Sequence, residues 1–152
     1  MELKIKCVDT TTASDGSQYG KFVIEPLERG FGQTVGNALR RVLLSSLEGA
    51  AVTSVRIEGI THEFPAIPGV VEDVIDIMLN LKGLVVKCDN EGEQHLRLDI
   101  EKPGPVLAQD LSLPSGVKVV NPDWLICTIS QGGSIHADLT VETGKGYIAI
   151  DV

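Results

Sequence analysis

The sequence has few aromatic residues, few cysteines and no long apolar run. Only 4% of its 152 residues are aromatic, against 43% that are hydrophobic, so a folded core must be mainly aliphatic. The three cysteines, Cys7, Cys88 and Cys127, are odd in number and widely spaced, which favours reduced structural thiols over a disulfide framework or a zinc site. No segment approaches the roughly 18–20 apolar residues of a membrane span, and the start lacks a signal-peptide apolar stretch. We therefore expect a soluble, intracellular protein without a membrane partner.

Basic charge is also scarce, because 13 Lys and Arg residues stand against 21 Asp and Glu residues, giving a net charge of −8. Unaided binding to DNA or RNA depends on clustered Lys and Arg, so this balance argues against it. Catalytic motifs are missing as well: His62-Glu63 resembles only the start of H-E-x-x-H, the serines lack a G-x-S-x-G context, and Gly144-Lys145-Gly146 is no P-loop. The sequence predicts a binding protein with no catalytic residue, cofactor or metal.

The first third of the chain predicts two strands and a helix. Alternating residues over 2–8 predict a strand with one buried face, 10–16 a polar turn, and 19–24 a strand that pairs back on the first and ends at Pro26. Thr34 is the expected N-cap of a helix that ends near Gly49. The helix carries one apolar stripe at spacings of three and four residues, formed by Val35, Ala38, Leu39, Val42, Leu43 and Leu47.

The rest of the chain is mostly β. A strand over 51–57 precedes a loop with His62, Pro65 and Pro68, and a helix follows over 70–82, with Glu72 and Asp73 in its first turn and Gly83 at its end. The expected later strands cover residues 84–87, 94–100, 116–121, 125–129 and 134–142, with a hairpin turn at 131–133. The pattern predicts an α+β fold with two units, residues 1–49 and 50–152.

The first helix offers a second face opposite its apolar stripe. At about 100° per residue, Leu44 points away from the stripe and Arg41 lies about 60° from Leu44 on the same side. An apolar side chain beside a guanidinium is typical of a partner surface, since Arg is favoured at interface cores. The alternative is that Leu44 widens the stripe and Arg41 is solvated.

The second helix leaves a similar choice. Its apolar side consists of Val70, Val71, Val74, Ile75, Met78 and Leu81. Lys82 projects on that side at the C-terminal end. It is either a snorkelling lysine that complements the helix C-terminus or a charge held at a contact surface.

The segment Gly30–Gly36 opens a helix after a strand, as a dinucleotide-binding turn does. Its spacing, however, is G-x-G-x-x-x-G, in which the extra residue moves the third glycine about 100° around the helix. Glu58 follows the next strand, where a ribose-binding acid could lie. A nucleotide-binding enzyme using this turn is therefore an alternative function, and a tight turn with close packing is the simpler explanation of the glycines.

Segments spread over nearly the whole chain match one known family. The longest runs from Phe22 to Gly32 (FVIEPLERGFG) and continues from Thr34 to Ser46 (TVGNALRRVLLSS). The others are residues 51–55 (AVTSV), 62–64 (HEF), 67–70 (IPGV), 72–74 (EDV), 79–84 (LNLKGL) and 144–147 (GKGY). On these residues the chain resembles the α subunit of bacterial-type RNA polymerase.

The resemblance implies a non-catalytic assembly scaffold. In this family two α subunits dimerise and then recruit the β subunit and later the β′ subunit. Residues 1–49 would form the first half of a partial α/β dimerisation domain, and residues 50–152 an inserted β-rich domain that contacts the large subunits. The implied β-subunit contacts are Arg41, Leu44 and Lys82, and the implied dimer interface is Val35, Leu39, Val42 and Leu43.

The family's amino-terminal region continues beyond the position of Val152, and a linker and a DNA-binding domain follow it. The chain is thus expected to be truncated, and a fragment that does not assemble is a further alternative. DNA would be reached only through the complex. The expected location is the bacterial cytoplasm, with the plastid stroma as the alternative.

Overall fold

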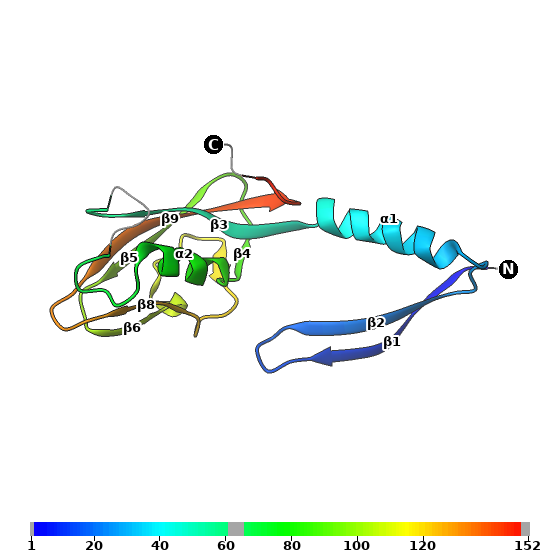
Figure 1. The fold of residues 1–152 in the computed structure, drawn as a ribbon, viewed down its shortest axis with the longest axis horizontal. Helices are drawn as coiled ribbons and strands as arrows, with labels where there is room; N and C mark the ends of the chain where they lie inside the picture. The colour runs from blue at the N-terminus through cyan, green and yellow to red at the C-terminus, as the bar shows by residue number, and fades with distance from the viewer. Residues whose placement is uncertain (1, 61–65, 150–152) are drawn as a thin grey trace. The chain divides into compact units, whose positions relative to one another are not determined.

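The computed structural model describes residues 2–60 and 66–149, so the predicted features at 61–65, including His62, lie outside the described residues. The chain divides into two compact units. Unit 1 comprises residues 1–48 and 145–152, and unit 2 comprises residues 49–144. Figure 1 shows the helices and strands of each unit in chain order. The α+β fold class is confirmed, while the roles assigned to the two domains stay predictions.

Unit 1 opens with an antiparallel hairpin of β1 (Lys4–Thr12) and β2 (Gln18–Glu25), as the pairing prediction requires. Its turn is held by Asp15, whose carboxylate accepts bonds from the Ser17 N–H at 2.9 Å and hydroxyl at 2.6 Å. The strand runs through Thr12, so the turn predicted from residue 10 begins too early. The predicted buried face of β1 is also wrong, because all nine residues of the strand are exposed. No described element of unit 1 covers the hairpin.

The helix of unit 1, α1, spans Phe31–Ser45. Its N-cap is Gly30, in a left-handed conformation with φ of 90°, so the prediction of Thr34 as N-cap is wrong and Thr34 lies inside the helix. The helix ends where the Ser46 N–H bonds to the Val42 carbonyl at 2.9 Å, and Gly49 belongs to the next strand. No residue of α1 is buried. The apolar stripe is therefore uncovered within the described residues.

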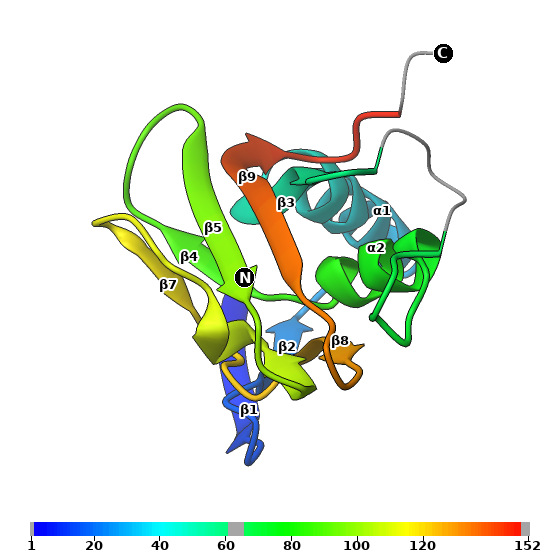
Figure 2. The same cartoon turned by 90° about the vertical axis from the view of Figure 1, so that its left-hand side faces the viewer.

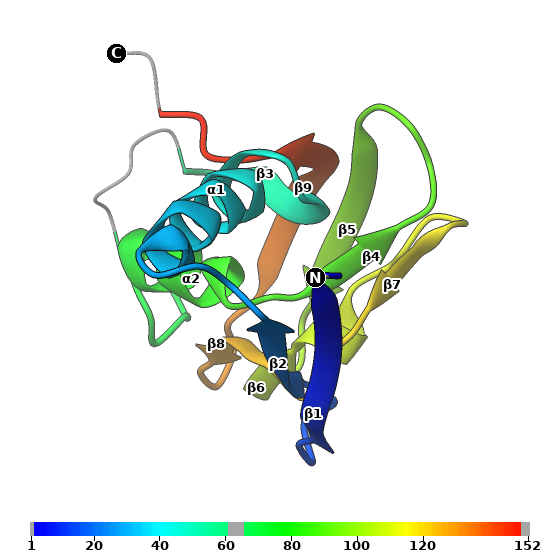
Figure 3. The same ribbon diagram turned by 90° about the vertical axis from the view of Figure 1, so that its right-hand side faces the viewer.

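Unit 2 contains a five-stranded sheet in the order β5-β9-β3-β4-β7. Its strands are β3 (Glu48–Ile57), β4 (Val86–Cys88), β5 (Gln94–Ile100), β7 (Val117–Val119) and β9 (Ile135–Lys145). Figure 2 shows β5, β9 and β3 side by side, and Figure 3 shows β4 and β7 together at the other end. A separate pair joins β6 (Gly104–Leu107) to β8 (Leu125–Ile129), and a 3₁₀ turn (Ala108–Asp110) follows β6.

The strand predicted over residues 134–142 is observed as β9, and its residues alternate between two faces. Its inward residues are buried and its outward residues are exposed or half-buried. The inward set is Ile135, Ala137, Leu139 and Val141. The predicted strands 94–100 and 125–129 have the observed bounds, and the other predicted strands differ by a few residues at their ends. The strand β6 and the 3₁₀ turn were not predicted, because Pro103 and Pro105 make the sequence of this segment typical of a loop.

The core of unit 2 lies between the sheet, β8 and α2 (Val74–Lys82). Ile77 and Leu81 of α2 meet Ile126 of β8 and Leu98 and Leu139 of the sheet around a small internal space. All buried apolar residues among those described lie between Ile57 and Val141, so unit 2 holds the core. The core is aliphatic, as the composition predicts.

The helix α2 begins four residues later than predicted. Asp73 is its N-cap and accepts the Asp76 N–H at 2.8 Å. Residues 69–72 instead attach to β8: Val71 N–H bonds to the Thr128 carbonyl at 2.9 Å. Glu72, predicted in the first turn, accepts the Thr128 N–H at 2.6 Å and hydroxyl at 3.0 Å. The backbone of this segment therefore pairs with a strand edge rather than with the helix.

The hairpin predicted at residues 131–133 is wrong, because β8 pairs with β6 whereas β9 pairs with β5 and β3. The glycines there have another role. The Ser130 N–H bonds to the Gly69 carbonyl at 2.8 Å, and Gly133 is buried against Gly69. A Cβ on Gly69 would lie 2.5 Å from the Gly133 Cα, closer than real side chains come. The two glycines permit the loop before α2 to dock on the chain after β8.

Replacing Gly69 with alanine should therefore destabilise unit 2 for two reasons, the strain of a positive φ and the clash of the added Cβ with Gly133. Gly132→Ala is the matched control, because Gly132 has φ of 76°, close to the 78° of Gly69, with nothing within 4 Å of the added Cβ. We expect a loss of about 1–2 kcal/mol in the free energy of unfolding for the control and a loss larger by about 1–3 kcal/mol for Gly69→Ala. Urea unfolding followed by circular dichroism measures both, and equal losses would contradict the close approach.

Candidate functional site

The structure places four predicted dimer-interface residues on one uncovered face of α1. Leu39, Val42 and Leu43 are exposed, with 57% of Leu43 accessible, and Val35 is half-buried. Several adjacent aliphatic side chains in contact with water cost free energy that burial against another surface recovers, at about 25 cal/mol per Å². Within the described residues, unit 1 supplies no cover for this face.

Arg41 and Leu44 lie on the same helix, one turn apart, and both are exposed. Leu44 has 61% of its surface accessible. The Arg41 carbonyl accepts the Ser45 hydroxyl at 2.6 Å, which involves the backbone and leaves the guanidinium available. Over residues 2–60 and 66–149, no carboxylate forms an ion pair with Arg41. The helix thus presents a five-donor fork beside an apolar side chain.

Lys82 lies in the last turn of α2, in unit 2, and is exposed. The predicted apolar side of this helix needs correction. Ile77 is buried with Val74 and Leu81, whereas Ile75 and Met78 are exposed, because the helix turns a different face to β8 and the sheet. The exposed apolar residues around α2 are Val71, Ile75, Met78 and Leu79. The helix therefore has an apolar outer face that ends at Lys82.

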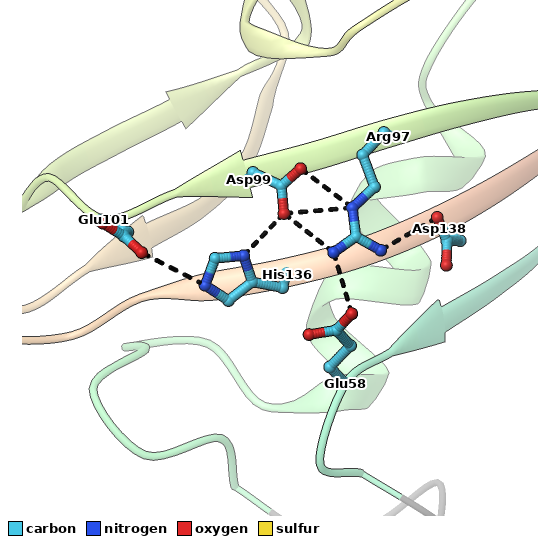
Figure 4. A network of polar contacts seen from close by, with 6 residues as sticks. All are labelled: Glu58, Arg97, Asp99, Glu101, His136 and Asp138. Atoms are coloured by element: carbon cyan, nitrogen blue, oxygen red, sulfur yellow. Dashed lines mark hydrogen bonds and ion pairs between the residues drawn. The ribbon is translucent and has the colours of Figure 1, made fainter.

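A polar network covers the outward side of β3, β5 and β9 (Figure 4). The Arg97 guanidinium contacts Asp99 of its own strand β5, Asp138 of β9 and Glu58, which lies in the turn directly after β3. Its Nη2 lies 2.9 Å from Glu58 Oε1 and 2.9 Å from Asp99 Oδ1, and its Nη1 lies 3.0 Å from Asp138 Oδ1. His136 Nδ1 lies 2.6 Å from the same Asp99 oxygen. The network links β5 and β9 to each other and to the turn after β3 on the solvent side of the sheet.

Charge within this network shifts two pKa values. The bonds from Arg97, and then that from His136, lower the pKa of Asp99 to about 2. The carboxylates of Asp99, Glu58 and Asp138 raise the pKa of Arg97 above its already high value. Asp99 therefore remains ionised through the neutral range, as an acceptor of hydrogen bonds rather than a proton donor.

The His136–Asp99 pair resembles part of a catalytic triad, but its surroundings do not fit one. The network lies on an exposed face, with Asp99 about half accessible, so water is not excluded from it. Among the residues that the structure describes, no group of three or more His, Cys, Asp or Glu side chains is placed to hold a metal ion. The geometry is that of a surface ion-pair network.

His136 lies on the outward, polar face of β9, and the sequence alone did not identify the network. The signal that could have found it is the shared alternation of two strands. Arg97 and Asp99 are outward residues of one strand, and His136 and Asp138 of another. The register pairs Arg97 with Asp138 and Asp99 with His136, and this register was not predictable from the sequence.

The Gly30–Gly36 segment does not form a dinucleotide-binding turn. The strand before it, β2, pairs antiparallel with β1, whereas that turn follows a parallel strand in a βαβ unit. Gly32 and Gly36 both lie inside α1, past its first residue. The nucleotide-binding alternative is therefore not favoured.

Two further observations concern thiols and membranes. Cys127 is buried in the core, and its burial raises the pKa of the thiol to about 12, which is typical of an inert structural cysteine. Throughout residues 2–60 and 66–149, no helix has both the length and the apolar character needed to cross a bilayer.

Comparison with known proteins identifies the class to which this fold belongs. Residues 55–151 match the model of the RNA polymerase Rpb3/RpoA insert domain, and the chain belongs to this family of RNA polymerase subunits. It is similar to the DNA-directed RNA polymerase subunit alpha of Gloeobacter violaceus, with 53% identity over 147 residues. The corresponding subunits of Carboxydothermus hydrogenoformans and Symbiobacterium thermophilum are 49% and 51% identical.

The aligned regions cover 97%, 97% and 95% of this chain but only 47%, 47% and 46% of the three relatives. The chain thus spans about half the length of the curated relatives it matches. The resemblance found in the motifs is confirmed over nearly the whole sequence.

Replacing Arg97 with methionine should raise the pKa of Asp99 from about 2 toward its usual 3.8, because the largest cause of its depression is removed. A lowered folded-state pKa of Asp99 stabilises the fold above about pH 4, and that contribution is lost as the pH falls through about 2. The variant should lose less stability over this acid range than the parent.

A carbon-13 NMR titration of the Asp99 carboxyl measures the shift. Arg56→Met is the control, because Arg56 is an exposed arginine of β3 that forms no ion pair with another described residue. An unchanged Asp99 midpoint in Arg97→Met would show that the network does not hold this carboxylate ionised.

Proposed function

We propose that this chain supplies assembly surfaces of an RNA polymerase α subunit and carries no catalytic residue. The observation that carries the proposal is its identity of about half with bacterial α subunits over nearly all of its length. The proposed partners are a second α subunit, the β subunit and then the β′ subunit, with DNA reached only through the complex. A net charge of −8 agrees with the absence of a DNA surface of its own.

Self-association uses four residues of the apolar stripe of α1, Val35, Leu39, Val42 and Leu43. The support is physical: these residues are aliphatic, adjacent on one helix face and mostly exposed. A second α1 helix provides the same kind of surface, and an interface between two identical chains is commonly self-complementary about a two-fold axis. Burial of both stripes removes their apolar area from water.

The opposite face of α1 binds the β subunit through Arg41 and Leu44. An unpaired guanidinium beside an exposed leucine combines the two contact types that dominate interface energetics, a charge-assisted hydrogen bond and an apolar anchor. Lys82, at the end of the outer face of α2, is a further contact for the large subunit. We expect the chain in the bacterial cytoplasm, with the plastid stroma as the alternative.

Replacing Arg41 with alanine should weaken capture of the β subunit by about tenfold or more, since truncating a charged anchor at an interface typically costs 2 kcal/mol or more. Arg40→Ala is the matched control, because it removes the same charge about 100° around the same helix. Co-expression with β followed by affinity capture measures the effect. If both variants lose β binding equally, the positive charge of the helix matters for binding but the position of Arg41 does not.

Capture experiments also separate the alternatives. If the parent chain is folded but captures no β subunit, the alternative of a fragment that does not assemble is supported. Saturable binding of a nucleotide that is lost in Gly32→Ala would instead support the nucleotide-binding alternative.

Two adjacent leucines of α1 test the division of its faces. Leu43→Ser should shift the chain from dimer toward monomer in size-exclusion chromatography with light scattering, because a polar group enters the stripe. Leu44→Ser makes the same chemical change at the next position and should leave the dimer intact while weakening β capture by about tenfold. If both variants lose self-association equally, the helix does not have two separate faces.

A further inference from the structure

The last turn of α2, which contains Lys82, is held by the side chains of three other residues. Asn80, Asn121 and Trp124 together form what we call the Trp124 bracket. The Trp124 indole N–H donates to the Asn80 carbonyl at 2.6 Å, and the Asn80 amide donates to the Ile126 carbonyl at 2.9 Å. Asn121 donates to the Gly83 carbonyl at 2.9 Å and accepts the Val85 N–H at 2.8 Å.

The bracket occupies carbonyl groups that a helix C-terminus usually leaves without partners. The last carbonyls of a helix lack intrahelical donors and carry a partial negative charge, so a lysine in the last turn often bonds to them. Here neutral donors from Trp124 and Asn121 reach the Asn80 and Gly83 carbonyls. Over residues 2–60 and 66–149, the Lys82 ammonium has no ion pair and no side-chain hydrogen bond. The Asn80, Leu81 and Gly83 carbonyls, three of the acceptors near such a lysine, thus already have donors.

Packing reinforces the same turn. The Trp124 ring lies against Gly83, where an added Cβ would be 2.1 Å from the ring carbon Cζ2. Gly83 has an ordinary negative φ of −82°, so the glycine is needed there for space rather than for backbone freedom. With 41% of Trp124 exposed, the indole covers the turn from the solvent side and keeps its N–H paired. The residues on either side of Lys82 are thus fixed before any partner binds.

We propose that Trp124 is a positioning residue that keeps Lys82 free, on a preformed turn, for a carboxylate of the large subunit. The inference rests on the proposed function, and it adds both the chemistry of the contact and the device that prepares it. A charge held on an ordered turn loses less conformational entropy on binding than one on a frayed helix end. A lysine that pairs with no carboxylate among the described residues is available for a charge-assisted bond with the partner.

A double-mutant cycle on β capture tests the proposal in the full chain. Lys82→Ala should weaken binding by about tenfold, as expected for one charge-assisted contact. Trp124→Phe retains the ring but removes the indole N–H, and it should weaken binding several-fold in the parent and have no further effect in Lys82→Ala. An equal effect of Trp124→Phe in both backgrounds would overturn the proposal, because Trp124 would then act independently of Lys82.

Amide hydrogen exchange gives a readout that does not depend on binding. In Trp124→Phe, the Gly83 and Leu84 amides should exchange at least about fivefold faster, while the amides of β5 and β9 stay unchanged. Uniform acceleration, or none, would contradict a local bracket. If the parent captures no β subunit, the proposed function fails and the exchange measurement alone decides whether the bracket holds the turn.

Discussion

The uneven burial of apolar surface is the constraint on which the rest of the structure depends. Folding requires apolar burial large enough to offset lost conformational entropy. Among the described residues, every buried apolar side chain lies between Ile57 and Val141, in unit 2. Unit 1 has a hairpin and a helix with no buried residue in the helix. Unit 2 therefore has the core of an independent domain, whereas unit 1 depends on further apolar contacts, and the uncovered stripe of α1 is the surface through which it can obtain them.

This constraint explains which predictions from sequence succeed. The alternation in β9 and the bounds of β5 and β8 follow from a strand lying between a core and water, which the sequence records directly. Exposed fractions in unit 1 could not be predicted, because an apolar stripe indicates that a face is buried but not by which molecule. The start of α2 was missed for a different reason. Residues 69–72 have helical patterning, but their backbone pairs with β8.

The contacts of polar side chains at the candidate sites could not be predicted from the sequence either. The motif around Asn80 and Gly83 identified the family, yet the structural work of these two residues is visible only in their contacts with Trp124 and Asn121, about 40 residues away in sequence. The network of Arg97 was not predicted because two of its partners, Asp138 of β9 and Glu58 after β3, are brought to it by a strand register that no local pattern specifies. Long-range polar contacts depend on topology, and topology is the level at which single-sequence reasoning is weakest.

The arginine and lysine residues of this chain differ in whether their charge is paired within the fold. Arg97 is surrounded by three carboxylates, so its charge is already neutralised within the fold and its contribution to a partner is small. Arg41 and Lys82 have no such neighbours among the described residues. A charge without such neighbours, next to an exposed leucine or at the end of an apolar face, keeps its capacity to pair across an interface. Pairing state, more than residue type, therefore distinguishes the cations that hold this fold together from those that are candidates for assembly.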